Sequence, residues 1–165
     1  MKKVTPKPKT CEGCPAFEKG QGFCPPEGNK VDPDMTFVFD GPSDLAHRFS
    51  VPFANKQKPF GPMFEGWVDE AGIDRDRIQR TNIVWCWLPG GRTNQIHVGQ
   101  RNPTPEEAEF CMKRHLLPHL RRTGAFDEGH VIVTVGHQAT RYLRGIEGSI
   151  EPHLGVVDGF SDPER

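Results

Sequence analysis

The chain of 165 residues lacks any long hydrophobic segment, and only 35% of its residues are hydrophobic. No run of about 18 apolar residues occurs, so the sequence predicts no membrane-spanning helix. The first residues, Met1-Lys2-Lys3-Val4-Thr5-Pro6, are not followed by an apolar stretch, which argues against a secretory signal peptide. We therefore expect a cytoplasmic protein, in which clustered cysteines are typical of metal binding or catalysis rather than of disulfides.

The chain also lacks an excess of charge, because 21 basic residues balance 22 acidic ones to a net charge of −1. The distribution is uneven: residues 75–122 contain nine Arg or Lys and only four Asp or Glu. A basic segment in a neutral protein is typical either of a surface that follows a phosphate backbone or of a solvated helix face. Charge alone favours the solvated face.

The 18 glycines and 16 prolines predict that much of the chain is loop. Its length fits a single domain. Residues 1–34 show no periodicity and are predicted to form an irregular arm. Residues 35–145 are predicted to form an α/β core, and residues 146–165 a tail that is either a linker or a truncated element.

Three short apolar runs predict buried strands, at about residues 35–40, 80–86 and 130–135. Helices are expected at about residues 62–72, 104–120 and 137–144. Thr104-Pro105-Glu106-Glu107 has the residues of a capping box, and Pro118 is expected to bend or end the helix that follows. Alternating strands and helices predict a three-layer αβα domain with a short parallel sheet.

Five cysteines are present, and four of them suggest a metal site: Cys11, Cys14, Cys86 and Cys111. Cys11 and Cys14 form a CxxC pair, whereas Cys86 and Cys111 are unpaired and 25 residues apart. Zinc and a [4Fe–4S] cluster both accept four thiolates. Structural zinc sites usually show two close pairs, so the spacing favours the cluster and leaves zinc as the alternative. Cys24 is predicted not to be a ligand.

Six motifs in order resemble the iron–sulfur uracil-DNA glycosylases, family four of the uracil-DNA glycosylase superfamily, over about residues 10–145. They are the CxxC pair, Phe39-Asp40-Gly41-Pro42-Ser43, Pro59-Phe60, Thr81-Asn82-Ile83-Val84-Trp85-Cys86, residues 101–111 from Arg101-Asn102-Pro103 to Cys111, and Ile132-Val133-Thr134-Val135-Gly136-His137-Gln138-Ala139. Each motif alone is weak, and the segment from Asn82 to Cys111 is the most specific. The resemblance implies a glycosylase-like α/β fold and a [4Fe–4S] cluster on the four cysteines.

The chain departs from the family pattern at three places. In the first motif, GE-x-PG in the family, Asp40 replaces Glu and both outer glycines are lost. Residues 93–100 resemble an insertion. The family's late His-Pro-Ser motif is missing, because no His-Pro dipeptide occurs in the sequence. We expect either that the chain is the front part of a longer protein or that the catalytic half has been lost.

The resemblance also implies site residues. Asn82 matches the amide that reads uracil, Phe60 matches the aromatic that stacks on the extruded base, and Gly41 and Pro42 match the substrate-binding turn. Asp40 is expected to help place the attacking water, with Asp44 as the second choice. His47 and His137 are candidates for the donor to the leaving base, although an exposed loop histidine is the simpler interpretation of both.

Three functions therefore compete. The first is excision of uracil from single- or double-stranded DNA by a monomeric repair enzyme. The second is a non-catalytic iron–sulfur DNA-binding module of glycosylase fold, at the front of a larger DNA-processing protein. The third is a zinc-binding interaction domain. For the first two, the predicted nucleic-acid surface contains Arg92, Arg101, Lys113 and Arg114.

Overall fold

Three parallel strands form the centre of the fold in a computed structural model, which describes residues 4–52, 60–91 and 99–146. They are β2 (Met35–Phe39), β3 (Ile78–Asn82) and β6 (Val131–Val135), with β2 between the other two. Phe39 at the end of β2 is level with Asn82 on one side and Val135 on the other. The three carboxyl ends therefore lie along one edge of the sheet, where open α/β sheets bind ligands.

Two further pairings were not foreseen in the sequence. Strand β1 (Glu27–Gly28), within the predicted irregular arm, pairs antiparallel with β3, which gives the order β1-β3-β2-β6. Strands β4 (Pro89–Gly91) and β5 (Gly99–Gln100) form a separate antiparallel pair. They flank most of the predicted insertion at residues 93–100. Residues 93–98 of the predicted insertion lie outside the described residues.

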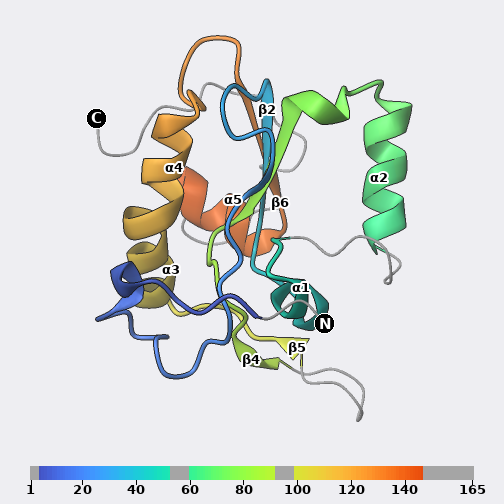
Figure 1. The fold of residues 1–165 in the computed structure, drawn as a ribbon. Helices are drawn as coiled ribbons and strands as arrows, with labels where there is room; N and C mark the ends of the chain where they lie inside the picture. Colours follow the sequence, from blue (N-terminus) through green and yellow to red (C-terminus); the bar gives the residue numbers. More distant parts are fainter. Residues whose placement is uncertain (1–3, 53–59, 92–98, 147–165) are drawn as a thin grey trace.

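Helices cover both faces of the sheet, as the three-layer prediction requires (Figure 1). Side chains alternate between the faces of a strand, so Phe37 and Phe39 point to one side and Val38 to the other. The phenylalanines pack with Phe64 and Val68 of helix α2 (Phe60–Glu70). Val38 belongs to a larger apolar core with α3 (Pro105–Cys111), α4 (Leu117–Arg122) and α5 (His137–Arg144). The predicted α/β architecture is confirmed.

The predicted helix at residues 104–120 begins as expected but does not stop at Pro118. The Thr104 hydroxyl accepts the Glu107 N–H and the Glu107 carboxylate accepts the Thr104 N–H, which completes the capping box. A π-helical turn, η3 (Met112–Leu116), then joins α3 to α4, and the Leu117 N–H donates to the Met112 carbonyl. This wider turn precedes Pro118, and the helical path continues to Arg122.

Helix α1 (Asp44–Phe49) was not among the predicted helices. Ser43 caps this helix by accepting the Ala46 N–H, and Ser50 ends it in the left-handed conformation. Short 3-10 turns, η1 (Lys9–Cys11) and η2 (Arg75–Arg77), complete the elements. Across the described ranges, none of the helices has the length and apolar character needed to cross a bilayer.

A buried polar network ties α4 to β3 and to the arm. The His119 Nε2 lies 2.7 Å from the Gln79 Oε1, and the Gln79 amide donates to the Asn29 carbonyl at 2.7 Å. The Arg122 guanidinium lies 2.8 Å from the His119 Nδ1. Because Arg122 can only donate, His119 is neutral, with its proton on Nε2. Burial, reinforced by the charges of Arg122 and Lys30, lowers the pKa of His119 to about 4.

This network predicts an acid-sensitive stability. Unfolded histidine has a pKa near 6.5, so between about pH 6.5 and 4 the unfolded chain binds a proton that folded His119 does not. The free energy of unfolding should fall as the pH is lowered through this window, by up to ~3 kcal/mol from this group. His119→Gln should flatten that part of the pH profile in urea unfolding. Equal slopes for the variant and the parent would contradict the assignment.

Candidate functional site

Asn82 is the most telling side chain at the carboxyl edge of the sheet. It is 0% exposed, and its Nδ2 donates to the Pro52 carbonyl at 3.0 Å. Its Oδ1 is buried and has no hydrogen-bond partner among the described residues. A buried acceptor left unpaired costs about 1–3 kcal/mol and calls for an explanation, such as an ordered water or a ligand. Other atoms of this kind occur among the described residues, but Asn82 stands at the carboxyl edge of the sheet, where its amide can present the acceptor to a ligand.

Phe60 lies on the same face of the sheet as Asn82. Asn82 is two residues beyond Arg80 and four beyond Ile78, and Ile78 packs in the cluster under α2. Phe60 begins α2, and its ring lies 6.4 Å from that of Phe39, the residue level with Asn82. Phe60 is 36% exposed and therefore lies partly at the surface. Two predicted site residues therefore lie on the same face of the sheet, one on β3 and one at the start of α2.

Asp40 has a structural task that the sequence did not reveal. Its Oδ1 accepts the Ala139 N–H at 2.7 Å, in the first turn of α5. The ordinary capping position of this helix is Gly136 (φ 114°), which has no side chain to accept a backbone N–H. A Cβ at Gly136 would lie 2.5 Å from the Asp40 Oδ1, so glycine makes room for the carboxylate. Asp40 therefore caps a helix 99 residues further along the chain.

The carboxyl group of Asp40 is partly withdrawn from solvent. Burial raises its pKa above the usual range, while backbone N–H groups of Ala139 and Gln138 and the charge of His137 oppose that shift. His137 therefore lies close enough to Asp40 for its charge to act on that carboxyl group. A carboxylate that accepts backbone N–H groups on one oxygen keeps acceptor sites on the other.

The turn after β2 is closely packed. Pro42 is fully buried, and a Cβ on Gly41 would lie 2.5 Å from the Gln100 Nε2 and 3.0 Å from a methyl group of Val84. Gln100, on β5, accepts the Leu88 N–H with its Oε1, while its Nε2 is buried without a partner in the described part of the chain. The amide of Gln100 is a feature that sequence reasoning missed, because it enters from the predicted insertion.

The two candidate histidines differ in surroundings. His47 is 8% exposed, stacks on Trp87 at 4.8 Å between ring centres, and contacts the Asp44 carbonyl through Nδ1 at 2.9 Å. The interpretation of His47 as an exposed loop residue is therefore wrong. The Asp44 carboxylate accepts from Arg48. His137 is exposed at the start of α5, and its Nδ1 lies 3.1 Å from the Gln138 Nε2.

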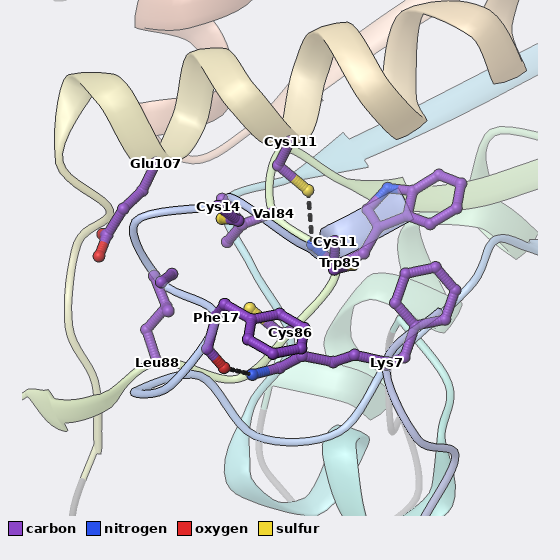
Figure 2. A pocket seen from close by; sticks show the side chains of 12 residues that line it. Lys7, Cys11, Cys14, Phe17, Val84, Trp85, Cys86, Leu88, Glu107 and Cys111 are labelled. Atoms are coloured by element: carbon purple, nitrogen blue, oxygen red, sulfur yellow. Dashed lines mark hydrogen bonds between the residues drawn. The ribbon is translucent and has the colours of Figure 1, made fainter. Parts of the chain in front are cut away.

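The four predicted ligand cysteines line one pocket (Figure 2). It encloses about 370 Å³, part of it open to solvent, between the arm, the segment after β3 and helix α3. Cys11 and Cys14 come from the arm, Cys86 follows β3, and Cys111 ends α3. The sulfurs line this space. Among the described residues, however, no three histidine, cysteine or acidic side chains lie close enough together to form a preformed metal site.

The chemistry of the lining fits a thiolate-bound group. Burial raises the pKa of the Cys11 thiol to about 11 and of the Cys86 thiol to about 12, and burial also raises the pKa of Cys111. The charges of the other pocket cysteines add to the shifts of Cys11 and Cys111. Thiols in such a place ionise when a cation replaces their protons. The donor set thus suits an iron–sulfur cluster or zinc, both of which bind four thiolates.

Cys24 is placed differently. It is 0% exposed and does not line the pocket, and its thiol points to the Ala46 carbonyl at 3.9 Å. Its backbone N–H donates to the Trp85 carbonyl at 2.7 Å. Burial raises the pKa of its thiol to about 12. Cys24 therefore packs, as a small apolar side chain of the arm, against α1.

Trp85 connects the cysteine pocket with Asn82. It is 6% exposed, and its backbone N–H donates to the Cys111 sulfur at 3.3 Å. Its indole N–H donates to the Asn82 carbonyl at 3.0 Å. The two candidate sites thus share one residue.

The predicted nucleic-acid surface is already engaged in contacts within the chain. Arg101 forms two 2.7 Å hydrogen bonds with the Glu107 carboxylate, whose pKa is lowered mainly by this bond. Lys113 pairs with Glu109 at 2.6 Å, and Arg114 lies over the Phe110 ring. Arg92 lies outside the described residues. Lys113 and Arg114 are exposed on η3, whereas Arg101 holds the loop before α3 in place.

Comparison with known proteins points in one direction. The chain is 30% identical over 111 residues to the type-4 uracil-DNA glycosylase of Thermotoga maritima, which covers 67% of this chain and 51% of that protein. It is 24% identical over 162 residues to that of Sulfurisphaera tokodaii, covering 98% and 66%, and 24% identical over 136 residues to that of Saccharolobus solfataricus, covering 82% and 55%. The chain thus spans about half to two thirds of the length of these relatives.

A family model described as the uracil DNA glycosylase superfamily matches residues 25–161. That range contains the sheet, the helices and the turn after β2, together with Cys86 and Cys111, while the CxxC pair lies before it. Because the match covers most of the chain and the α/β fold agrees with it, this chain belongs to the uracil DNA glycosylase superfamily.

Proposed function

We propose that the chain recognises uracil in DNA and acts in its excision by hydrolysis of the N-glycosidic bond. The observation that carries this proposal is the buried Oδ1 of Asn82 at the carboxyl edge of the sheet, which has no hydrogen-bond partner within residues 4–52, 60–91 and 99–146. Uracil presents an N–H at N3, next to the O4 carbonyl. The Oδ1 suits that N–H, and the second hydrogen of Nδ2 suits the O4 carbonyl. Cytosine has an unprotonated N3 at the same place and would leave the Oδ1 unpaired.

In this proposal the base leaves the DNA stack and enters beside Phe60. The partly exposed ring offers a stacking surface next to Phe39, on the face of the sheet that also carries Asn82. Stacking of a base on an aromatic ring contributes about 1–3 kcal/mol. Gly41 and Pro42 shape the turn beside Asp40, and glycine keeps that turn close to Gln100.

Asp40 is assigned two roles, which the chemistry of a carboxylate allows. One oxygen caps α5, and the other is proposed to orient the attacking water. The capping contact is also the observation that favours the second candidate function, a non-catalytic DNA-binding module, because a carboxylate fixed by a helix is fully accounted for by structure. We expect slow excision, since each missing donor to a leaving anion costs about 10²- to 10³-fold in rate.

A [4Fe–4S] cluster is proposed to be held by Cys11, Cys14, Cys86 and Cys111, with zinc as the alternative. When bound, the group would offset part of the charge of four thiolates and would cross-link the arm to the core. Lys7 lines the pocket, and its ammonium group donates a hydrogen bond to the Phe17 carbonyl. Its positive charge opposes the increase in the pKa of Cys11 and Cys86 and so favours their thiolates. The proposed role is structural.

Asn82→Ala tests recognition without requiring fast chemistry. The parent chain should bind a single-stranded oligonucleotide with one uracil more tightly than the same oligonucleotide with cytosine, measured by fluorescence anisotropy. A two-point contact with a base is worth about 1–3 kcal/mol, so the variant should lose about 5- to 150-fold of that preference. Asn102→Ala, at an exposed asparagine, is the matched control. An undiminished uracil preference in Asn82→Ala would refute the proposed reader.

Asp40 variants separate the cap from the chemistry. Asp40→Ala should lower the free energy of unfolding by about 0.5–2 kcal/mol, the usual value of a helix cap, whereas Asp40→Asn keeps an acceptor for Ala139 and should stay close to the parent. If Asp40 also orients water, Asp40→Asn should excise uracil more slowly than the parent in a gel-based cleavage assay. Asp44→Asn is the comparison in the same segment. Equal rates for Asp40→Asn and the parent would leave Asp40 as a cap only and favour the non-catalytic module.

Cysteine variants test the ligand set. Cys86→Ser should lose bound iron and sulfide, because it removes a pocket sulfur, and should loosen the arm. Cys24→Ser should keep full iron and sulfide content, since Cys24 does not line the pocket. Metal analysis of both purified variants, with zinc measured beside iron, decides between the two cofactors. Iron retained in Cys86→Ser and lost in Cys24→Ser would overturn the assignment.

A further inference from the structure

His115 is a buried histidine whose ring reaches a predicted ligand cysteine. It lies in the π-helical turn η3 and is 8% exposed. Its Nε2 is 3.2 Å from the Cys11 sulfur, across 104 residues of sequence. Cys111 and His115 are four residues apart on one helical path, so both face the same side of it. The same helical path therefore places the Cys111 sulfur in the pocket and the His115 ring nitrogen next to the Cys11 sulfur.

Aromatic neighbours fix the orientation of this ring. It stacks on Trp85, with centres 5.3 Å apart and planes 28° apart, and meets Phe23 edge-on at 5.3 Å. Phe23 belongs to the arm, whereas Trp85 follows β3. The ring is thus packed between the arm and the segment after β3, the two parts of the chain that meet at the cysteine pocket. A contact of this kind is set by packing and does not depend on a mobile side chain finding its partner.

We propose that His115 is a positioning residue of the cysteine centre, whose Nε2–H donates a hydrogen bond to the Cys11 sulfur. This inference rests on the cofactor proposed above. A thiolate is an acceptor, so the proton lies on Nε2 and the neutral ring acts as a donor. Hydrogen bonds to cluster sulfurs stabilise the more negative, reduced state and make the reduction potential more positive. The same bond lowers the electron density on sulfur and protects Cys11 from alkylation.

Among the groups that act on the pocket sulfurs, the His115 ring is the hydrogen-bond donor that a substitution can remove. Trp85 also donates to a pocket sulfur, Cys111, but it does so through its backbone N–H, which substitution leaves in place. Lys7 acts through charge near Cys11 and Cys86. His115→Phe removes the N–H and keeps an aromatic ring against Trp85 and Phe23. His115→Gln removes the ring and keeps an N–H donor of similar reach.

The test measures three properties of the purified, anaerobically prepared chain: iron, sulfide and zinc content, reduction potential by voltammetry, and the rate at which iodoacetamide modifies Cys11, mapped by mass spectrometry. His115→Phe should retain its metal, show a more negative potential and react faster at Cys11. His115→Gln should return both properties toward the parent. His130→Phe is the matched control, because His130 contacts the Thr36 hydroxyl far from the pocket residues; it should change neither.

Each outcome decides the matter. A potential and a Cys11 alkylation rate in His115→Phe equal to those of the parent would overturn the hydrogen bond while leaving the cluster intact. Loss of metal from both variants would show that His115 is itself a ligand, and would overturn its role as a donor. A parent chain that carries zinc would remove the proposed cluster, and the alkylation rate alone would then support or reject the hydrogen bond to Cys11.

Discussion

The docking of the arm against the segment that follows β3 is the constraint on which both candidate sites depend. Backbone hydrogen bonds join the two: Gln21 and Trp87 exchange N–H···O bonds at 2.8 and 2.9 Å, and Cys24 donates to Trp85 at 2.7 Å. Gly20 lies so close to Cys86 that a Cβ there would be 2.6 Å from its sulfur. The arm has few apolar side chains of its own, so these contacts and the sulfurs around them determine where it lies. Its position then places Cys11 and Cys14 opposite Cys86.

The same segment also positions Asn82 at the carboxyl edge of the sheet. Trp85 gives its backbone N–H to Cys111 and its indole N–H to the carbonyl of Asn82. The side chain of Asn82 is turned the other way, to Pro52, which follows α1. Residues 82–86 therefore leave the sheet edge in a conformation held at both ends.

Local patterns were enough to predict the central strands and the start of α3. Continuous apolar runs marked β2 and β6, and a capping box needs only four adjacent residues. What could not be predicted depends on partners distant in sequence. The short strand β1 has only two residues and exists because β3 lies beside it. Asp40 reads as a turn residue until β6 brings α5 next to it, and the histidines at 47, 115 and 119 look polar although aromatic neighbours bury all three. Cysteine spacing and the family resemblance grouped four sulfurs and left Cys24 out, but they could not show that the Cys24 thiol lies against the Ala46 carbonyl.

The position of β2 has a consequence for the order in which the chain is made. It is the central strand, yet both neighbours are synthesised after it: β3 follows by 43 residues and β6 by 96, as the pairs Met35–Ile78 and Met35–Val131 show. A ribosome adds about 5–20 residues per second, so the buried side chains of β2 wait roughly 5–20 s for their second partner. During that time Phe37, Val38 and Phe39, which the folded protein buries, lack the strands that pair with them, and an unpaired apolar segment of this kind can associate with the wrong chain. The strand order therefore sets the interval during which the nascent chain is open to pairing with a wrong partner.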